Sequence, residues 1–100
     1  MMERLSFEIG RIVRSRQGRD AGRCFVILQV VDEQFVMMAD GLTRKLTHPK
    51  KKKLKHLYPK PVMLEGIVEG LNSHQLLDSD LRKALNAAGF GIDQPLCKEG

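Results

Sequence analysis

Five arginines gather around two glycines in the first third of the sequence. They lie in residues 10–28, which read GRIVRSRQGRDAGRCFVIL, and they are Arg11, Arg14, Arg16, Arg19 and Arg23. Gly18 and Gly22 stand in a polar loop between two apolar runs, and glycine adopts positive φ without steric cost. The pattern therefore predicts a strand, a tight turn and a second strand. Guanidinium groups at such a turn are rigid, forked donors that suit phosphate oxygens.

The alternative for this turn is a solvated hairpin in which Asp20 pairs with Arg19 or Arg23. Exposed ion pairs contribute only about 0–1 kcal/mol, so stability alone hardly requires five arginines at one turn. We therefore favour contact with RNA. The two glycines are assigned to backbone geometry rather than to cradling phosphate, and no GK[ST] follows them, which excludes a P-loop.

A second basic block contains Lys50–Lys53, with Arg44 and Lys45 before it and Lys55 after it. No acidic residue occurs between Asp40 and Glu65. Four adjacent lysines repel one another unless an anion neutralises them. Nucleic acid is the favoured anion, since ammonium groups add affinity without reading sequence. The alternatives are a flexible solvated loop and contact with lipid or an acidic protein.

The remaining polar side chains suggest no catalysis. His48, His56 and His74 have no cysteine or carboxylate at metal-ligand spacing, so no metal is expected. His56 next to Tyr58 could stack on an unpaired base, although a histidine packed in the core is the preferred interpretation. Aromatic residues make up only 5% of the chain, which favours recognition of RNA shape and backbone. No nucleophile–base pair or carboxylate pair can be defended, so neither an enzyme nor a cofactor is predicted.

The overall charge also favours a polyanionic partner. The chain has 100 residues, enough for one domain, and a net charge of +5. Residues 1–60 carry 14 Lys or Arg and 6 Asp or Glu, whereas residues 61–100 carry 3 and 6. Only the first part looks suited to bind an anion.

The elements that must position these residues are mainly short strands. We expect strands over residues 9–14, 23–31, 35–39, 42–46 and 56–58. In the second strand Cys24 and Val26 alternate with Phe25 and Ile27, so both faces are apolar and the strand should be central. The lysine run is predicted to be a loop because prolines flank it. Several short strands with tight turns predict a mainly β fold, a small SH3-like antiparallel barrel.

The last forty residues differ in character. Residues 62–71 are apolar without a clean period, so helix and strand are equally compatible there. Residues 79–88 should form a helix that Asp78 or Ser79 caps and Gly89 ends. Its face of Leu77, Leu81, Leu85 and Ala88 should meet the barrel, and residues 90–100 read as a tail. The predicted division is a barrel in residues 1–61 and a C-terminal extension in residues 62–100.

Cysteine usage and the N-terminus indicate a cytoplasmic protein. Cys24 and Cys97 are far apart and form no CxxC pair, and Cys24 is expected to be a buried free thiol rather than half of a disulfide. The N-terminus has no apolar segment typical of a signal peptide, and no membrane-spanning run is found.

Two stretches of the sequence resemble a known family. GRIVRSRQGRDAGRCFVIL resembles the KOW motif of RNA-binding SH3-like barrels. DGLTRKLTHPKKKKLKHL resembles its continuation in KOW proteins of Gram-positive bacteria, which are similar to KOW-bearing large-subunit ribosomal proteins of archaea and eukaryotes. The resemblance covers residues 7–58, with Gly22 at the family's glycine. It implies a ligand of ribosomal or other structured RNA, no catalysis, and an RNA-facing position for Arg16, Arg19 and Arg23.

We therefore predict a non-catalytic RNA-binding protein that is associated with the ribosome and with translation. A protein-interaction module that docks a transcription or translation factor is the alternative, and neither a membrane nor a small-molecule substrate is expected. The candidate RNA contacts are Arg14, Arg16, Arg19, Arg23, Arg44, Lys45, Lys50, Lys51, Lys52, Lys53, Lys55 and His56.

Overall fold

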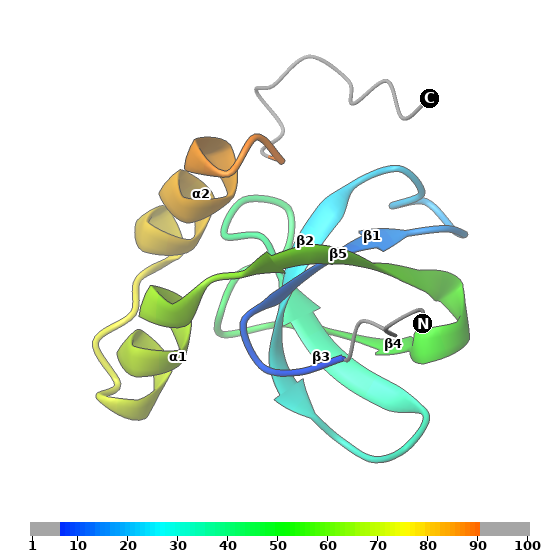
Figure 1. The fold of residues 1–100 in the computed structure, drawn as a ribbon, viewed down its shortest axis with the longest axis horizontal. Helices are drawn as coiled ribbons and strands as arrows, with labels where there is room; N and C mark the ends of the chain where they lie inside the picture. Colours follow the sequence, from blue (N-terminus) through cyan, green and yellow to red (C-terminus); the bar gives the residue numbers. More distant parts are fainter. Residues whose placement is uncertain (1–6, 91–100) are drawn as a thin grey trace.

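The computed structural model describes residues 7–90, which form one antiparallel sheet with two helices beside it (Figure 1). The strands are β1 Arg11–Ser15, β2 Cys24–Val30, β3 Phe35–Ala39, β4 Lys50–Lys53 and β5 Leu57–Met63. A short 3-10 turn, η1 Leu54–His56, joins β4 to β5. The helices are α1 Glu65–Asn72 and α2 Asp78–Ala87. This confirms the predicted mainly β fold.

The strand order β4-β3-β2-β1-β5 places β2 at the centre of the five-stranded sheet. β2 pairs with β1 through Val13↔Phe25 and with β3 through Ile27↔Met38. Strands that are consecutive in sequence mostly lie side by side, and the N-terminal β1 also pairs with the C-terminal β5. This arrangement is that of a small barrel-like sheet, and it confirms that β2 is central.

Two apolar clusters occupy the two faces of the sheet. The inner cluster consists of Val13, Phe25, Ile27, Val36, Met38 and Leu57, with Phe7 and Leu54 packed against it. The outer cluster is covered by the helices, through Ile67 of α1 and Leu81 and Leu85 of α2. Cys24 and Val26 belong to this outer cluster, so the alternation along β2 sends its side chains to both faces as predicted.

The helix α2 ends as predicted but begins differently. Gly89 has φ +88°, and the N–H of Phe90 donates to the carbonyl of Leu85, the geometry that commonly ends a helix at glycine. Asp78 and Ser79 do not cap the helix, because they lie inside its first turn. Instead the carboxylate of Asp80 accepts a hydrogen bond from the N–H of Leu77. Leu77 is 62% exposed, so its predicted contact with the sheet is wrong.

Residues 40–46 form a loop rather than the predicted fourth strand. The buried Asp40 carboxylate accepts hydrogen bonds from the N–H groups of Leu42, Thr43 and Arg44. These bonds fold the backbone back on itself, so it cannot join a ladder. Gly41 has φ +80° and lies so close to α2 that a Cβ would collide with the carbonyl of Asp78. The loop therefore rests against α2.

The lysine run is a strand, which corrects the predicted loop. Lys50–Lys53 pairs with β3 through Val36↔Lys52 and Met38↔Lys50 and forms one edge of the sheet. Pro59 and Pro61 do not end this region either, because both lie within β5 on the opposite edge.

The segment 62–71, which the sequence left open between helix and strand, contains both. Its first two residues end β5 and Glu65 begins α1. The predicted boundary after residue 61 thus falls inside β5, and the two-part division of the chain stays a prediction. Residues 91–100, including Cys97 and most of the predicted tail, lie outside the described residues.

Candidate nucleic-acid interface

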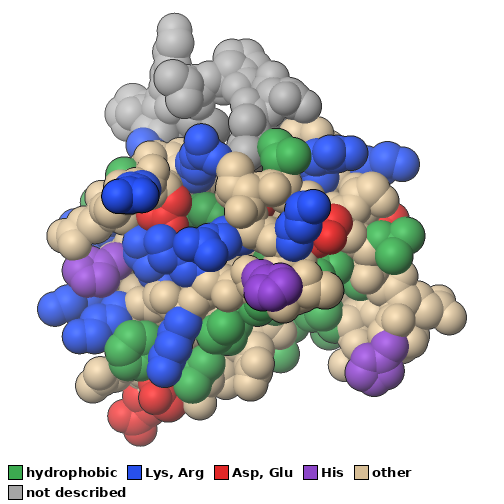
Figure 2. Space-filling model, turned by 180° about the vertical axis from the view of Figure 1, so that it is seen from behind, with side chains coloured by type: hydrophobic (Ala, Val, Ile, Leu, Met, Phe, Trp, Pro, Cys, Tyr) green, Lys and Arg blue, Asp and Glu red, His purple; other side chains and the backbone are tan. Residues whose placement is uncertain are grey.

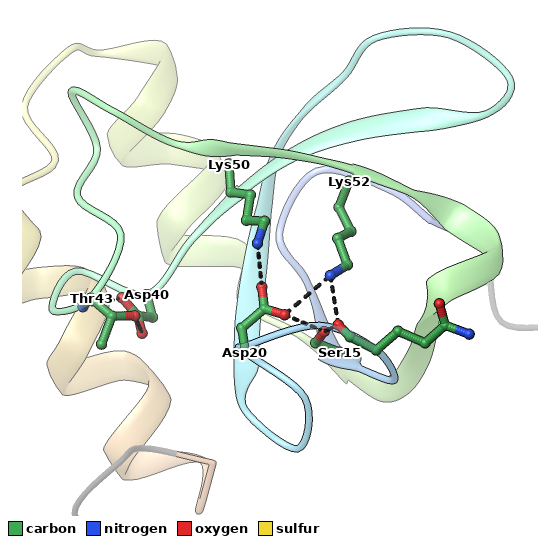
Figure 3. A network of polar contacts seen from close by, with 7 residues as sticks. Ser15, Asp20, Asp40, Thr43, Lys50 and Lys52 are labelled. Atoms are coloured by element: carbon green, nitrogen blue, oxygen red, sulfur yellow. Dashed lines mark hydrogen bonds and ion pairs between the residues drawn. The ribbon is translucent and has the colours of Figure 1, made fainter.

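A single carboxylate joins the two basic segments that the sequence singled out (Figure 3). Asp20 lies in the arginine loop, the name used here for residues 16–23 between β1 and β2. Lys50 Nζ is 3.1 Å from Asp20 Oδ2, and Lys52 Nζ is 3.1 Å from Oδ1. Lys52 also donates to the carbonyl of Gln17 at 2.9 Å. The arginine loop is therefore fastened to β4.

The surroundings of Asp20 favour its charged form. The side chain is only 12% exposed, and this burial alone would raise its pKa. Ser15 Oγ donates to Oδ1 at 2.8 Å, and the hydrogen bonds from Ser15, Lys52 and Lys50 outweigh the burial. The pKa of Asp20 is accordingly lowered to about 2. Asp20 stays negative at every physiological pH.

The partners of Asp20 differ from those expected for a solvated hairpin, which were Arg19 or Arg23. The carboxylate of Asp20 pairs with two lysines of β4 rather than with Arg19 or Arg23. Arg19 and Arg23 are both exposed. The charges of Lys50 and Lys52 are partly neutralised by the protein itself, so these lysines fasten the arginine loop to β4 as well as adding to the local positive potential.

The other two lysines of β4 point away from Asp20, because side chains alternate along a strand. Lys51 Nζ lies 4.7 Å and Lys53 Nζ 5.8 Å from the centre of the Phe35 ring. Both lysines are exposed. A cation over an aromatic face is stabilised by the ring's negative face while it stays accessible to solvent. These ammonium groups are therefore held in place but remain available to an anion.

Arg16 makes the corresponding contact beside β5. Its guanidinium carbon lies 4.5 Å from the centre of the Tyr58 ring, and its backbone N–H donates to the carbonyl of His56 at 2.8 Å. Partial desolvation lowers the pKa of His56, and the charges of nearby lysines and of Arg16 lower it further. No residue of η1 is buried, so His56 is a surface residue and not the packed core histidine that the sequence favoured.

The remaining candidates differ in exposure. Arg44, Lys45 and Lys55 are exposed, whereas Arg14 is half-buried in β1. Figure 2 shows lysine and arginine side chains across much of one face of the molecule, with few acidic ones among them. The sequence did not point to Ser15 or Phe35 as parts of this region, and it suggested Arg19 or Arg23 rather than lysines as partners of Asp20. Side-chain alternation along a strand would have divided the four lysines of KKKK into two pairs.

Residues 7–90 contain no group of three or more His, Cys, Asp or Glu side chains placed to hold a metal ion. Within the same residues no helix has the length and apolar character needed to cross a membrane.

Comparison with known proteins identifies relatives in archaea. Large ribosomal subunit protein eL14 of Pyrobaculum calidifontis is 30% identical over 83 residues, which are 83% of this chain and 75% of that protein. The protein of the same name from Methanococcus maripaludis is 33% identical over 87 residues, 85% of this chain and 96% of its own length. The Pyrobaculum arsenaticum protein is 33% identical over 83 residues, again 83% of this chain and 75% of that protein. No protein-family model matches the sequence.

The fold and the surface define a small basic protein built on a barrel-like antiparallel sheet. The sequence identity to the archaeal proteins, and the large share of each chain over which it extends, then narrow this class to one family. The chain belongs to the eL14 family of large ribosomal subunit proteins. Its relatives are ribosomal proteins and not enzymes, in agreement with the non-catalytic function predicted from the sequence.

Proposed function

We propose that the chain is an RNA-binding protein of the ribosome that contacts ribosomal RNA through the arginine loop and β4. The observation that carries the proposal is the pair of ion pairs from Asp20 to Lys50 and Lys52, here called the Asp20 junction. It brings the arginine loop and β4 into one surface. The names of the relatives, which place those proteins in the large ribosomal subunit, support the same ligand. A cytoplasmic location, where ribosomes translate, is part of the proposal.

The proposal divides the basic side chains by what they do. Lys50 and Lys52 are bound to Asp20 and fix the geometry. The RNA backbone would lie against side chains that are exposed or half-buried, namely Arg14, Arg16, Arg19, Arg23, Arg44, Lys45, Lys51, Lys53, Lys55 and His56. Such contacts bind phosphates, and RNA shape would supply the specificity.

The proposal also assigns the arginine loop to the KOW motif. The arginine loop has the glycine of the KOW pattern at Gly22, whose φ of +87° only glycine adopts readily, with open space around its Cα. We infer that the loop is a KOW-type RNA-binding loop. The second basic block resembles that of KOW proteins of Gram-positive bacteria, and we propose such a source for this chain.

Salt dependence tests whether phosphates are the ligand. Affinity for a fragment of large-subunit ribosomal RNA, measured by fluorescence anisotropy, should fall steeply as salt rises, by about 0.7–0.9 logarithmic units per logarithmic unit of salt for each phosphate contacted. An affinity for the RNA that does not change with salt would contradict binding through phosphates.

Crosslinking in cells followed by sequencing of the attached RNA tests which RNA is bound. Reads concentrated in a few sites of large-subunit ribosomal RNA are expected. Reads spread evenly over messenger and ribosomal RNA would contradict recognition of a particular RNA shape.

A further inference from the structure

An aromatic ring stands half-exposed inside the basic surface. Tyr58 on β5 is 49% exposed and is the only tyrosine of the chain. One side of its ring faces the guanidinium of Arg16, whose central carbon is 4.5 Å from the ring centre. A tyrosine that only stabilised the fold would gain most by burying its ring. Here the ring's neighbour is itself a flat, charged, exposed group.

The backbone holds this pair in a defined position. Tyr58 pairs with Arg14 in the β1–β5 ladder, so its place is set by the sheet. The backbone N–H of Arg16 donates to the carbonyl of His56 at 2.8 Å, and its guanidinium Nη1 donates to the carbonyl of Lys55 at 3.5 Å. Tyr58 thus lies within the β1–β5 ladder, and Arg16 follows β1 directly and is bound to the segment that precedes β5.

The surroundings of the pair suit the backbone of a nucleic acid. The positive charges that act on the neighbouring His56 come from Lys55, Lys52, Lys53 and Arg16. A nucleotide consists of a flat base attached to a phosphate, and this site offers a flat stacking surface beside clustered cations. Proteins commonly bind unpaired bases by stacking them on aromatic rings and on arginine planes.

We propose that Tyr58 and Arg16 form a stacking site for one unpaired nucleobase. The base extends the ring–guanidinium stack while its flanking phosphates lie against Lys53 and Lys55, the exposed lysines near His56. This inference rests on the proposed RNA-binding function and deepens it. It adds an unpaired nucleotide to a recognition that otherwise depends on backbone and shape.

The full chain can be tested with two RNA hairpins of the same sequence. One hairpin carries 2-aminopurine, a fluorescent base, in its loop, and the other carries an abasic nucleotide at that position. Because the chain has one tyrosine and no tryptophan, its intrinsic fluorescence reports on Tyr58 alone. We expect the first hairpin to quench both the tyrosine and the 2-aminopurine. The abasic hairpin should bind about tenfold more weakly and leave the tyrosine emission nearly unchanged.

Two variants test whether stacking requires the aromatic ring of Tyr58 or its hydroxyl group. Tyr58→Leu should weaken binding of the 2-aminopurine hairpin about tenfold and hardly change binding of the abasic one, whereas Tyr58→Phe should bind both like the unaltered protein. If Tyr58→Leu does not fold, the comparison of the two hairpins on the unaltered protein decides the question.

The outcomes distinguish the two proposals. Binding of both hairpins with equal affinity and unchanged tyrosine emission would overturn the stacking site and leave RNA binding intact. Failure of both hairpins to bind even at low salt, together with failure of ribosomal RNA fragments, would overturn the proposed function and the stacking site with it.

Discussion

The ammonium nitrogen of Lys52 lies 3.1 Å from Asp20 Oδ1, although 32 positions separate the two residues in the sequence. Lys52 is 9% exposed, so a charge of β4 is largely removed from solvent at this point. A buried charge is tolerated when it is paired and hydrogen-bonded, as this one is by Asp20 and by the carbonyl of Gln17. The pair connects the arginine loop to the edge of the sheet.

Removing the charge of Asp20 should destabilise the protein. Asp20→Asn leaves Lys50 and Lys52 without their carboxylate, and we expect a loss of about 1–3 kcal/mol in the free energy of unfolding. Denaturant unfolding followed by circular dichroism measures this loss. Glu33→Gln removes one negative charge from an exposed position and is the matched control, for which little change is expected. Equal stability of the two variants would mean that the junction does not hold the loop.

The contribution of Asp20 should depend on pH in the acid range. Because folding lowers its pKa from 3.8 to about 2, the ionised group stabilises the folded state at pH values above 3.8. That stabilisation, about 2 kcal/mol, is lost as the pH falls through the folded-state value of about 2. The difference in unfolding free energy between the unaltered protein and Asp20→Asn should therefore be constant above about pH 5 and shrink toward about pH 2. A difference that grows on acidification would contradict this assignment.

Reversing exposed charges should weaken RNA binding without affecting the fold. Arg19→Glu and Lys51→Glu should each lower affinity and reduce the salt slope by about one, while the melting temperature stays nearly the same. Lys83→Glu on α2 makes the same charge change at an exposed position outside the arginine loop and β4. If Lys83→Glu weakens binding as much as the other two, net charge and not the proposed surface is responsible. A large fall in melting temperature would show that Arg19 or Lys51 is structural.

Two glycines should respond in opposite ways to alanine. Gly41→Ala forces a Cβ onto the carbonyl of Asp78 at φ +80°, and we expect a loss of more than about 2 kcal/mol. Gly66 lies in α1, where an added Cβ would meet nothing within 4 Å beyond its own helix backbone, so Gly66→Ala should stabilise the protein by about 0.5–1 kcal/mol. Thermal unfolding compares the two variants directly. Similar effects of both would contradict the contact between the loop and α2.

The pattern of residues alone was sufficient to predict those strands and helices that are defined by their own apolar side chains. β2 alternates between two buried faces, and its central position followed from that alternation. The helix α2 could be predicted from the spacing of Leu81 and Leu85 and from Gly89 after its end. In each case the information lies within a short run of neighbouring residues.

Predictions from the residue pattern were wrong where contacts with residues outside the segment determine its structure. β4 has no apolar residue, and it is a strand because β3 pairs with it and Asp20 neutralises two of its lysines. Residues 42–46 have the composition of a strand, but the carboxylate of Asp40 ties their N–H groups into a turn. The candidate site was foreseen as two basic segments, whereas the acid that joins them was assigned to the wrong partners.

The edges of the sheet have a consequence for self-association. An open sheet edge presents unpaired backbone groups to which a strand of a second molecule could add. On one side that strand would have to lie against the four lysines of β4. On the other side it would meet β5, where Pro59 and Pro61 have no N–H to donate. Like charges repel at one edge and donors are missing at the other, so both edges disfavour pairing with the sheet of a second molecule.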